Sequence, residues 1–316
     1  MFDGIKRVYR NYKYTKKMST DARFYLDRLE ADIIRFTHAI EKGLSIERPR
    51  PGFGIVKISH LLDMIIIFAN KKTANEECIL MAIATLKEYF LFEDSISFTS
   101  DDYENNRKGF NAFLSANKID YDKIDVSYGG TITIERKESM KKSFSDLVFA
   151  RHSVRVFSKE PVPLETLKNA LRLAQQAPSA CNRQAVRIYL VDKNSQRKEL
   201  YEWLTGVGGF ERDVDKYLLI TGKVTAYQIY DMNQHIVSAA FYAAYLTLAL
   251  EEFGVATCVI QRPLFRDDEW IDIAKQYQIP DDEQIVLAMA LGMKKDTYKV
   301  PKSHRYSIDK IFKILS

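Results

Sequence analysis

Apolar residues recur at spacings of three and four through most of the first 117 residues, which is the period of an amphipathic helix. The spacing predicts four helices, over residues 21–42, 55–70, 75–92 and 101–117. Gly43 is placed to end the first helix, and Ser100 or Asp101 is a suitable N-cap for the last. Residues 1–117 are therefore expected to form an all-helical domain, and no catalytic motif is recognisable in it.

The pattern changes between residues 118 and 142. Three aspartates alternate with apolar residues there, and Gly129-Gly130 precedes a short β-type run at 131–134. The spacing of Asp120, Asp122 and Asp125 is similar to a calcium-binding loop, but the glycine and the closing glutamate of such a loop are missing. Residues 118–142 are expected to be a linker, and no metal site is expected.

From residue 143 onward, helical and strand-like patterns alternate. Helices are predicted over 164–174, 196–204, 231–253 and 267–277, and strands over 186–191, 217–221, 255–260 and 285–291. The long helix at 231–253 is rich in alanine, which permits close packing, so it is expected to be a central core helix. The alternation predicts an α+β or α/β sandwich with a mixed sheet over residues 143–316.

Composition excludes several classes of protein. Of the 316 residues, 46% are hydrophobic and 28% charged, values typical of a globular protein, and the net charge of +5 is too small to indicate nucleic-acid binding. No apolar run is long enough for a membrane span. The three cysteines are far apart, which is typical of a reducing cytoplasm. The glycines at 206–209 do not match a dinucleotide-binding fingerprint.

Two stretches carry candidate chemistry. Arg151-His-Ser-Val-Arg-Val-Phe157 places Arg151, Ser153 and Arg155 on alternate positions, hence on one face of an extended segment. Two guanidinium groups and a hydroxyl suit a phosphate.

The second stretch, residues 177–184, carries the hydrogen-bonding side chains of Ser179, Asn182 and Gln184, none of which is a charged acid or base, and such side chains suit the edge of a heterocycle. Cys181 lies in this stretch, but no histidine partner is evident from the spacing. It is therefore interpreted as a small packing residue.

The order Arg-x-Ser-x-Arg-x-Phe, then Ala-Pro-Ser-Ala-x-Asn-x-Gln, then a hydrophobic strand, resembles the opening of the nitroreductase family of flavin enzymes. The resemblance covers residues 143 to about 310. It implies a nitroreductase-like α+β sandwich that forms a homodimer with FMN at the interface. Such enzymes take a hydride from NAD(P)H onto flavin N5 and then reduce a second substrate, such as a nitroaromatic or a quinone, by a ping-pong mechanism.

The resemblance also implies roles for residues, while the hydride itself is carried by the flavin. Arg151, His152 and Ser153 are implied at the phosphate, and Arg155 near the pyrimidine ring and ribityl chain. The loop contributed to the ring by the partner subunit comprises Pro178, Ser179, Ala180, Asn182 and Gln184. Residues 254–262 are expected along the isoalloxazine, with Ile260 and a backbone N–H of Gln261 or Arg262 near N5. A basic tail motif implicates Lys302 and Arg305 at the phosphate.

The chain departs from the family pattern in three places. Ala185 and Val186 replace a proline and an aromatic residue, and residues 222–231 are shorter than the substrate-covering insertion of several relatives. The N-terminal helical domain is absent from simple family members, and we hypothesise that it covers the pocket through the Arg48–Gly54 loop.

Two alternatives to an enzyme remain open. One is a flavin-binding sensor or assembly subunit without NAD(P)H turnover. The other is a nucleic-acid or membrane-surface adaptor built on the basic N-terminus.

Overall fold

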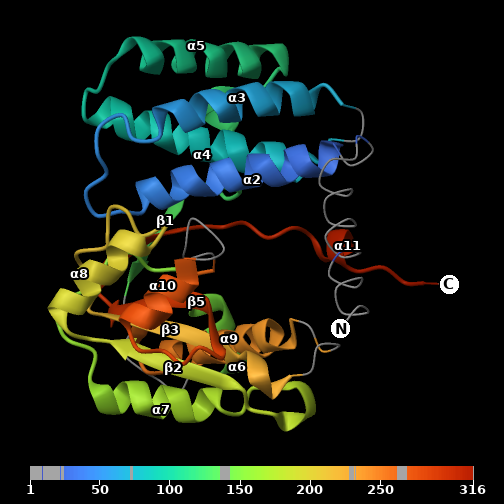
Figure 1. Cartoon of the computed structure of the whole chain (residues 1–316). Coiled ribbons are helices and arrows are strands. Elements are labelled where there is room, and N and C mark those ends of the chain that lie inside the picture. Colours follow the sequence, from blue (N-terminus) through green and yellow to red (C-terminus); the bar gives the residue numbers. More distant parts are fainter. Residues whose placement is uncertain are drawn as a thin grey trace. The chain divides into compact units, whose positions relative to one another are not determined.

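The computed structural model describes residues 9, 22, 25–71, 74–135, 143–227, 231, 233–261 and 269–315. The chain divides into two compact units (Figure 1). The helical unit comprises Met1–Thr133 and Lys299–Ser316, and the sheet unit comprises Ile134–Tyr298. The C-terminal segment, which was expected in the second domain, thus belongs with the helices, because it packs against them. Most of the basic N-terminal stretch and the end of the expected linker lie outside the described residues.

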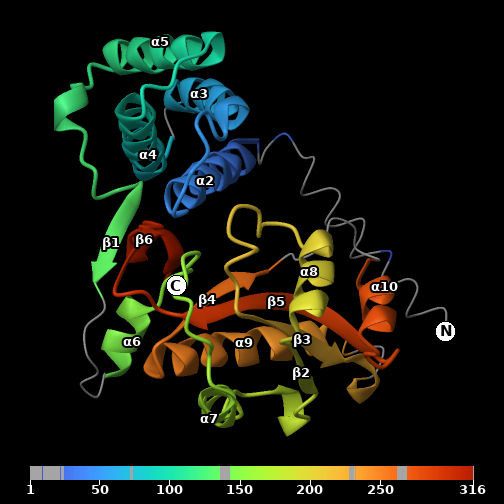
Figure 2. The ribbon, with the colours of Figure 1, turned by 90° about the vertical axis from the view of Figure 1, so that its left-hand side faces the viewer.

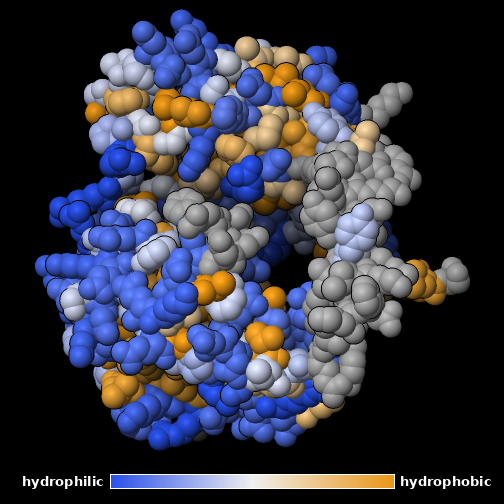
Figure 3. All heavy atoms as spheres, viewed as in Figure 1, coloured by the Kyte–Doolittle hydropathy of each residue, from blue (hydrophilic) through white to orange (hydrophobic). Residues whose placement is uncertain are grey.

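All four helices expected in the helical unit are present. They are α2 (Tyr25–Leu44), α3 (Ile55–Ala69), α4 (Glu76–Ser95) and α5 (Asp101–Ala116), and they pack on one another as Figure 2 shows. Ser100 is the N-cap of α5, because its side chain accepts a hydrogen bond from the backbone N–H of Tyr103 at 3.1 Å. In the space-filling view, apolar side chains interrupt the mainly hydrophilic surface over α3 and α5 (Figure 3).

Aromatic residues fill much of the helical core. Phe90 and Phe110 stack at 5.4 Å, and Phe53 meets Tyr89 edge-on at 5.2 Å. Each fully buried side chain of this size contributes about 1.5–3 kcal/mol through removal of apolar surface from water. This buried cluster draws on all four helices, so the helical unit has a core of its own.

A buried carboxylate fixes the loop between α2 and α3. Both oxygens of Glu93 accept from the backbone N–H of Gly52, at 3.1 and 3.0 Å. Burial raises the pKa of Glu93, while the hydrogen bonds from Gly52 and Tyr89 oppose that shift. The buried carboxylate therefore fixes the loop backbone at Gly52, whereas Arg48 and Arg50 of the same loop are exposed to solvent.

The sheet unit contains a four-stranded sheet in the order β2-β3-β5-β4. The strands are β2 (Val186–Val191), β3 (Lys216–Lys223), β5 (Glu283–Met293) and β4 (Val255–Ile260). All three pairings in this sheet are antiparallel. A mixed sheet was expected. Within the described residues, the parallel pairing is limited to a single bridge between Ser153 and Thr257.

Helices cover both faces of this sheet (Figure 2). The Ala-rich helix α9 (Gln234–Glu252) lies along one face, and α7 (Leu164–Ala174) packs outside it. The other face carries α8 (Asn194–Trp203) and α10 (Glu269–Gln276), which are tied together where the Tyr277 hydroxyl donates to the Gln196 carbonyl at 2.7 Å. The predicted core helix is thus confirmed, since Leu246 and Leu250 of α9 are fully buried against the sheet.

Two strands join the units. The chain leaves the helical unit within β1 (Thr131–Glu135), returns within β6 (Thr297–Pro301), and these strands pair as a separate two-stranded sheet. The sequence pattern did not predict β6. Among the described residues, no helix is long and apolar enough to cross a membrane.

Candidate functional site

The stretch 151–157 lies against the edge strand β4. Helix α6 (Phe144–Ala150) begins with a capping box formed by Ser143 and Asp146 and ends at Arg151, whose backbone turns extended. The N–H of Val154 then donates to the Thr257 carbonyl at 2.8 Å. This contact places two of the sequence-predicted segments, 151–157 and 254–261, side by side.

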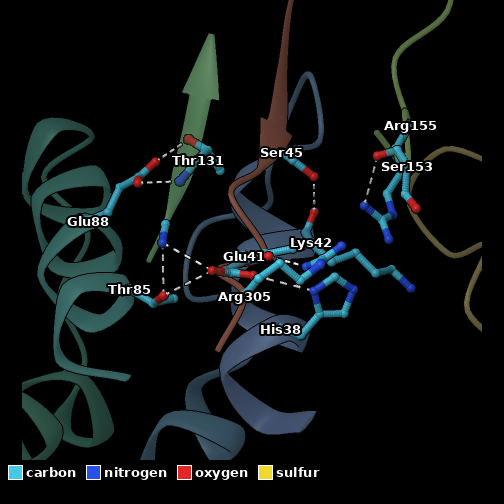
Figure 4. Close-up of polar contacts among 12 residues, drawn as sticks. His38, Glu41, Lys42, Ser45, Thr85, Glu88, Thr131, Ser153, Arg155 and Arg305 are labelled. Carbon is cyan, nitrogen blue, oxygen red and sulfur yellow. Dashed lines mark hydrogen bonds and ion pairs between the residues drawn. The ribbon is translucent and has the colours of Figure 1, made fainter. Parts of the chain in front are cut away.

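Arg155 is buried without an adequate partner. Its side chain is 6% exposed, and its Nη1 donates to the Ser153 carbonyl at 3.3 Å, as Figure 4 shows. Its Nε is buried and has no hydrogen-bond partner within the described part of the chain. A buried donor left in this state costs about 1–3 kcal/mol, so the position fits a ligand that supplies anionic or carbonyl oxygens.

The other residues of this stretch are less buried. Arg151 and Ser153 are half-buried, so the shared face predicted for Arg151, Ser153 and Arg155 is not equally open to solvent. The His152 ring is oriented by Nδ1, which lies 2.9 Å from the carbonyl of Ala150. A carbonyl only accepts, so Nδ1 is the donor, and in the neutral ring Nε2 is the acceptor.

The loop 177–184 has an unusual backbone. Cys181, Asn182 and Gln184 have positive φ angles of 52°, 52° and 49°, a region that non-glycine residues occupy at a cost of about 1–3 kcal/mol each. The loop is closed by Ser179, whose Oγ accepts from the N–H of Gln184 at 3.1 Å. The side chains of Asn182 and Gln184 are exposed, and clustered strain of this kind is typical of ligand-binding loops.

A groove of about 590 Å³ runs beside this loop. It is bounded by the loop, the end of α7, strand β2 and helix α9. Its lining comprises Leu171, Gln175, Ala177, Pro178, Ser179, Arg183, Gln184, Val186, Arg187, Ile188, Ser238 and Tyr242. The Arg183 guanidinium pairs with Asp231 at 2.7 Å and lies over the Tyr227 ring at 4.9 Å. Pro178, Ser179 and Gln184 thus line one groove.

The two clusters lie at opposite edges of the sheet. Ser153 bridges to Thr257 on β4, whereas the groove is at β2, and strands β3 and β5 lie between them. At a strand spacing of about 4.8 Å, the two edges are roughly 14 Å apart. Within a single copy of the chain, the two halves of the predicted site therefore lie far apart.

The remaining predicted residues are distributed as follows. Ile260 is buried at the end of β4 and pairs with Ala288, and Gln261 is exposed just beyond it. Arg262 lies outside the described residues. Lys302 and Arg305 belong to the helical unit, where the Lys302 ammonium donates to the carbonyls of Val126 and Gly129.

Sequence reasoning missed several groove residues. Arg183 lies in the predicted loop but outside the recognised motif letters, and the Asp231 and Tyr227 that hold it are distant in sequence. Ser238 and Tyr242 are one helical turn apart on α9, where the pattern indicated only a core helix. The i, i+4 spacing of these two polar side chains was the feature of the sequence that could have indicated a polar face on this helix.

Part of this chain is similar to known proteins. A family model described as the nitroreductase family matches residues 148–212 and 223–293. An iodotyrosine deiodinase from Thermotoga neapolitana is 28% identical over 179 residues, 49% of this chain and 90% of that protein. An iodotyrosine dehalogenase 1 homologue from Caenorhabditis elegans is 24% identical over 52% of this chain and 58% of its own length. This chain thus spans less than two thirds of the nematode protein.

Two solved structures align with about half of this chain. An FMN-dependent nitroreductase from Clostridium difficile is 23% identical, covering 47% of this chain and 86% of that chain, with a TM-score of 0.42. A nitroreductase family protein from Streptococcus pneumoniae is 17% identical, covering 55% of this chain and 100% of that chain, with a TM-score of 0.46.

Proposed function

Because the sheet unit belongs to the nitroreductase family of flavin-dependent oxidoreductases, we propose that this chain binds FMN and catalyses NAD(P)H-dependent reduction of a conjugated acceptor. Bound flavin would accept the hydride at N5 and pass electrons to the acceptor in a second half-reaction. The single observation that carries the proposal is the buried, under-satisfied guanidinium of Arg155 in the motif that resembles the family's cofactor-binding segment.

The proposed roles of the residues follow from their chemistry. Arg151 and Ser153 hold the phosphate, with His152 beside them. Arg155 places a fixed positive charge near the pyrimidine ring, where reduction adds negative charge, and such preorganised charge favours the reduced state. Ile260 keeps water from the ring, and a backbone N–H at Gln261 or Arg262 orients N5. Lys302 and Arg305 remain predicted phosphate contacts.

A homodimer is part of the proposal. The separation of the two clusters supports it, because a second copy would supply the loop containing Pro178, Ser179, Ala180, Asn182 and Gln184 to the first copy's cofactor. An exposed apolar stripe supports it as well. Val237, Phe241 and Tyr245 follow one another at four-residue intervals on α9 and are 42%, 48% and 43% exposed. Phe144, Val148 and Phe149 of the neighbouring α6 are also exposed.

The groove supports an aromatic acceptor. Its volume is in the range of small-molecule sites, and it combines an aromatic side chain, Tyr242, with the cations Arg183 and Arg187. Nitroaromatics and quinones are the first candidates. A second candidate is reductive dehalogenation of a halogenated phenol, favoured by the names of the two curated relatives. The three cysteines, all among the described residues, form no disulfide, which supports action in the cytoplasm.

The test is an anaerobic titration of the purified, FMN-loaded full chain with NADH and then NADPH, followed by absorbance in the visible range. Bleaching of the flavin band followed by reoxidation with a quinone or a nitroaromatic supports the proposal. Bleaching by dithionite alone, with reoxidation by iodotyrosine, favours the dehalogenase. A flavin that NAD(P)H leaves oxidised, and that no acceptor reoxidises after dithionite, favours a sensor or assembly subunit. Failure to bind FMN contradicts all three.

A further inference from the structure

A second pocket, of about 360 Å³, lies between helix α8 and the loop that connects α8 to β3. All of its lining residues belong to the sheet unit, and none of them lines the groove beside loop 177–184. That groove is bounded by α9, whereas α8 covers the opposite face of the sheet (Figure 2). The pocket is therefore separate from the site proposed for the acceptor, and its volume fits a small molecule.

Helix α8 supplies one wall of this pocket. Its lining residues are Asn194, Arg197, Lys198 and Tyr201, whose spacing places them on one face of the helix. Arg197 is fixed there because its Nη1 donates to the backbone carbonyls of Asp192 and Asp215. Its Nε and Nη2 have no acceptor within the described part of the chain, so they remain available to a ligand.

The loop 204–215 supplies the other wall. Phe210 and Val214 of this loop are buried, which anchors its backbone on the sheet unit. Glu211 and Arg212, which line the pocket, are thus held beside α8. Oε2 of Glu211 accepts from the N–H of Gly209 at 2.7 Å, and this bond leaves Oε1 for a donor on a ligand.

Positive charge predominates among the lining residues. The three cations Arg197, Lys198 and Arg212 face one carboxylate, that of Glu211, so two positive charges are in excess. Lys198 and Arg212 are exposed, and neither has a hydrogen-bond or ion-pair partner among the residues that the structure describes. This excess matches a dianionic phosphate monoester better than a single carboxylate.

The neighbouring carboxylates are engaged outside the pocket. Asp192 and Asp215 do not line it, and they pair with the ammonium of Lys216 at 2.9 and 3.0 Å. The contact of Asp192 with Nη1 of Arg197 is long, at 3.9 Å. These two carboxylates therefore leave Lys198 and Arg212 unpaired.

A buried hydroxyl without a hydrogen-bond partner lies beneath the pocket. Tyr217 of β3 is fully buried, and its hydroxyl has no partner within the described residues. Leu218 and Ile220 pack in the core beneath α9, so strand alternation directs Tyr217 to the α8 face. Burial, then the charge of Glu211, raises the pKa of Tyr217, whereas Arg197 lowers it. The hydroxyl thus keeps its proton and lies among residues that line the pocket.

We propose that this pocket is an accessory binding site for a small phosphate monoester whose body carries hydroxyl groups, such as a sugar phosphate. Arg197, Lys198 and Arg212 bind the phosphate through charge-assisted hydrogen bonds. Oε1 of Glu211 accepts from a hydroxyl of the body, and the Tyr217 hydroxyl supplies a donor at the base of the pocket. The inference stands independently of the proposed function, because no residue of the pocket is assigned to FMN.

The test is isothermal titration calorimetry of the full chain saturated with FMN, with inorganic phosphate, glycerol 3-phosphate and ribose 5-phosphate as probes. Saturation with FMN keeps the probes from the cofactor site. The two monoesters are expected to bind more tightly than inorganic phosphate, because only they offer hydroxyl groups to Glu211. If none of the probes binds, if a probe displaces the flavin, or if succinate binds as tightly as ribose 5-phosphate, the proposal is overturned. A chain that binds no FMN contradicts the proposed function alone and is titrated without it.

Variants locate the site. Lys198→Gln and Arg212→Gln are each expected to raise the Kd for ribose 5-phosphate by roughly threefold to thirtyfold. Lys275→Gln is the matched control, since it removes the same charge from an exposed position of α10 that does not line the pocket, and it should leave the Kd unchanged. If Lys198→Gln and Arg212→Gln bind the probe as tightly as the wild type, the pocket is not the site.

Tyr217→Phe tests the donor at the base of the pocket. The variant is expected to bind ribose 5-phosphate more weakly, while its Tm without the probe stays the same or rises, because the hydroxyl that it removes has no partner. A lower Tm together with an unchanged Kd would overturn the role assigned to this hydroxyl.

Discussion

The backbone N–H of Val154 donates a hydrogen bond to the carbonyl of Thr257 at 2.8 Å. This contact joins the segment that carries two arginines to the strand expected along the flavin ring, although the two are far apart in sequence. It also fixes the backbone on either side of Val154, so Ser153 and Arg155 project from a rigid support. The predictions for the cofactor follow from this placement.

Arg151→Ala is expected to weaken FMN binding. Loss of a hydrogen bond between charged groups costs on the order of 1.5–3 kcal/mol, or about tenfold to 150-fold in Kd. Arg151→Lys should fall between the wild type and the alanine variant, because it keeps the charge but loses the bidentate geometry. Isothermal titration with FMN measures both, and full FMN occupancy in the alanine variant would contradict the phosphate assignment.

Arg155→Met is expected to have opposite effects on the stability of the apoprotein and on the binding of FMN. Removing the unpartnered Nε removes a desolvation cost of about 1–3 kcal/mol, so the apoprotein should be as stable as the wild type or more stable. Stabilisation by added FMN should fall sharply, because that stabilisation depends on affinity. Thermal unfolding with and without FMN measures both effects.

Arg172→Met is the matched control for Arg155→Met. Arg172 is exposed on α7 and pairs with Glu165, and such surface pairs contribute little. Both its apoprotein stability and its response to FMN are expected to match the wild type. A marked loss of apoprotein stability in Arg155→Met would mean that the guanidinium has a structural rather than a ligand-binding role.

Val237→Glu is expected to prevent dimerisation, because it places a charge within the exposed apolar stripe on α9. The variant should sediment as a monomer and bind FMN more weakly. Val56→Glu makes the same change on α3, where Val56 is 60% exposed, and should leave both properties unchanged. Analytical ultracentrifugation compares the two, and a dimeric Val237→Glu protein would place the subunit interface elsewhere.

Glu93→Gln is expected to alter the pH dependence of stability. The pKa of Glu93 is raised in the folded state above its ordinary value of 4.5. The contribution of its carboxyl to the free energy of unfolding is therefore fully present below pH 4.5 and is lost as the pH rises through the raised pKa. The glutamine cannot ionise and its amide oxygen can still accept from Gly52. The variant should therefore become more stable relative to the wild type as the pH rises from 4.5 through the raised pKa of Glu93.

Urea unfolding from pH 4 to pH 8 measures the Glu93→Gln effect. Glu104→Gln, an exposed change on α5, is expected to give a curve that runs parallel to the wild type. If the Glu93→Gln curve is parallel as well, the carboxylate does not carry the pH dependence assigned to it.

The cysteines are expected to react very differently with a thiol reagent at pH 8. Burial, followed by the charge of Glu30, raises the pKa of Cys78 to about 12, so its thiolate is scarce as well as inaccessible. Cys181 is exposed on the groove loop and should react first, and the reaction should slow when FMN and the partner subunit cover that loop. A fast-reacting thiol that persists in Cys181→Ser would refute this assignment.

Periodicity alone predicted most of the secondary structure. The helix at 164–174 and the strands at 186–191 and 255–260 agree with the structure to the residue. These elements are decided by contacts between residues close in sequence, and their apolar spacing records which face is buried. The motif around Arg151 could likewise be recognised in the sequence, because all its residues lie within seven consecutive positions.

The tertiary structure decided what depends on residues distant in sequence. Strand β6 was missed because its pairing with β1 joins positions more than 160 residues apart. Arg155 is buried next to Val154, whose backbone contacts Thr257 of β4, and the hydroxyl of Tyr306 donates to Glu30 of α2. The sequence by itself determined the elements and the candidate chemistry, since both are local. Only packing decided which cation is buried without a partner and which unit holds the C-terminal segment, because those outcomes arise from long-range contacts.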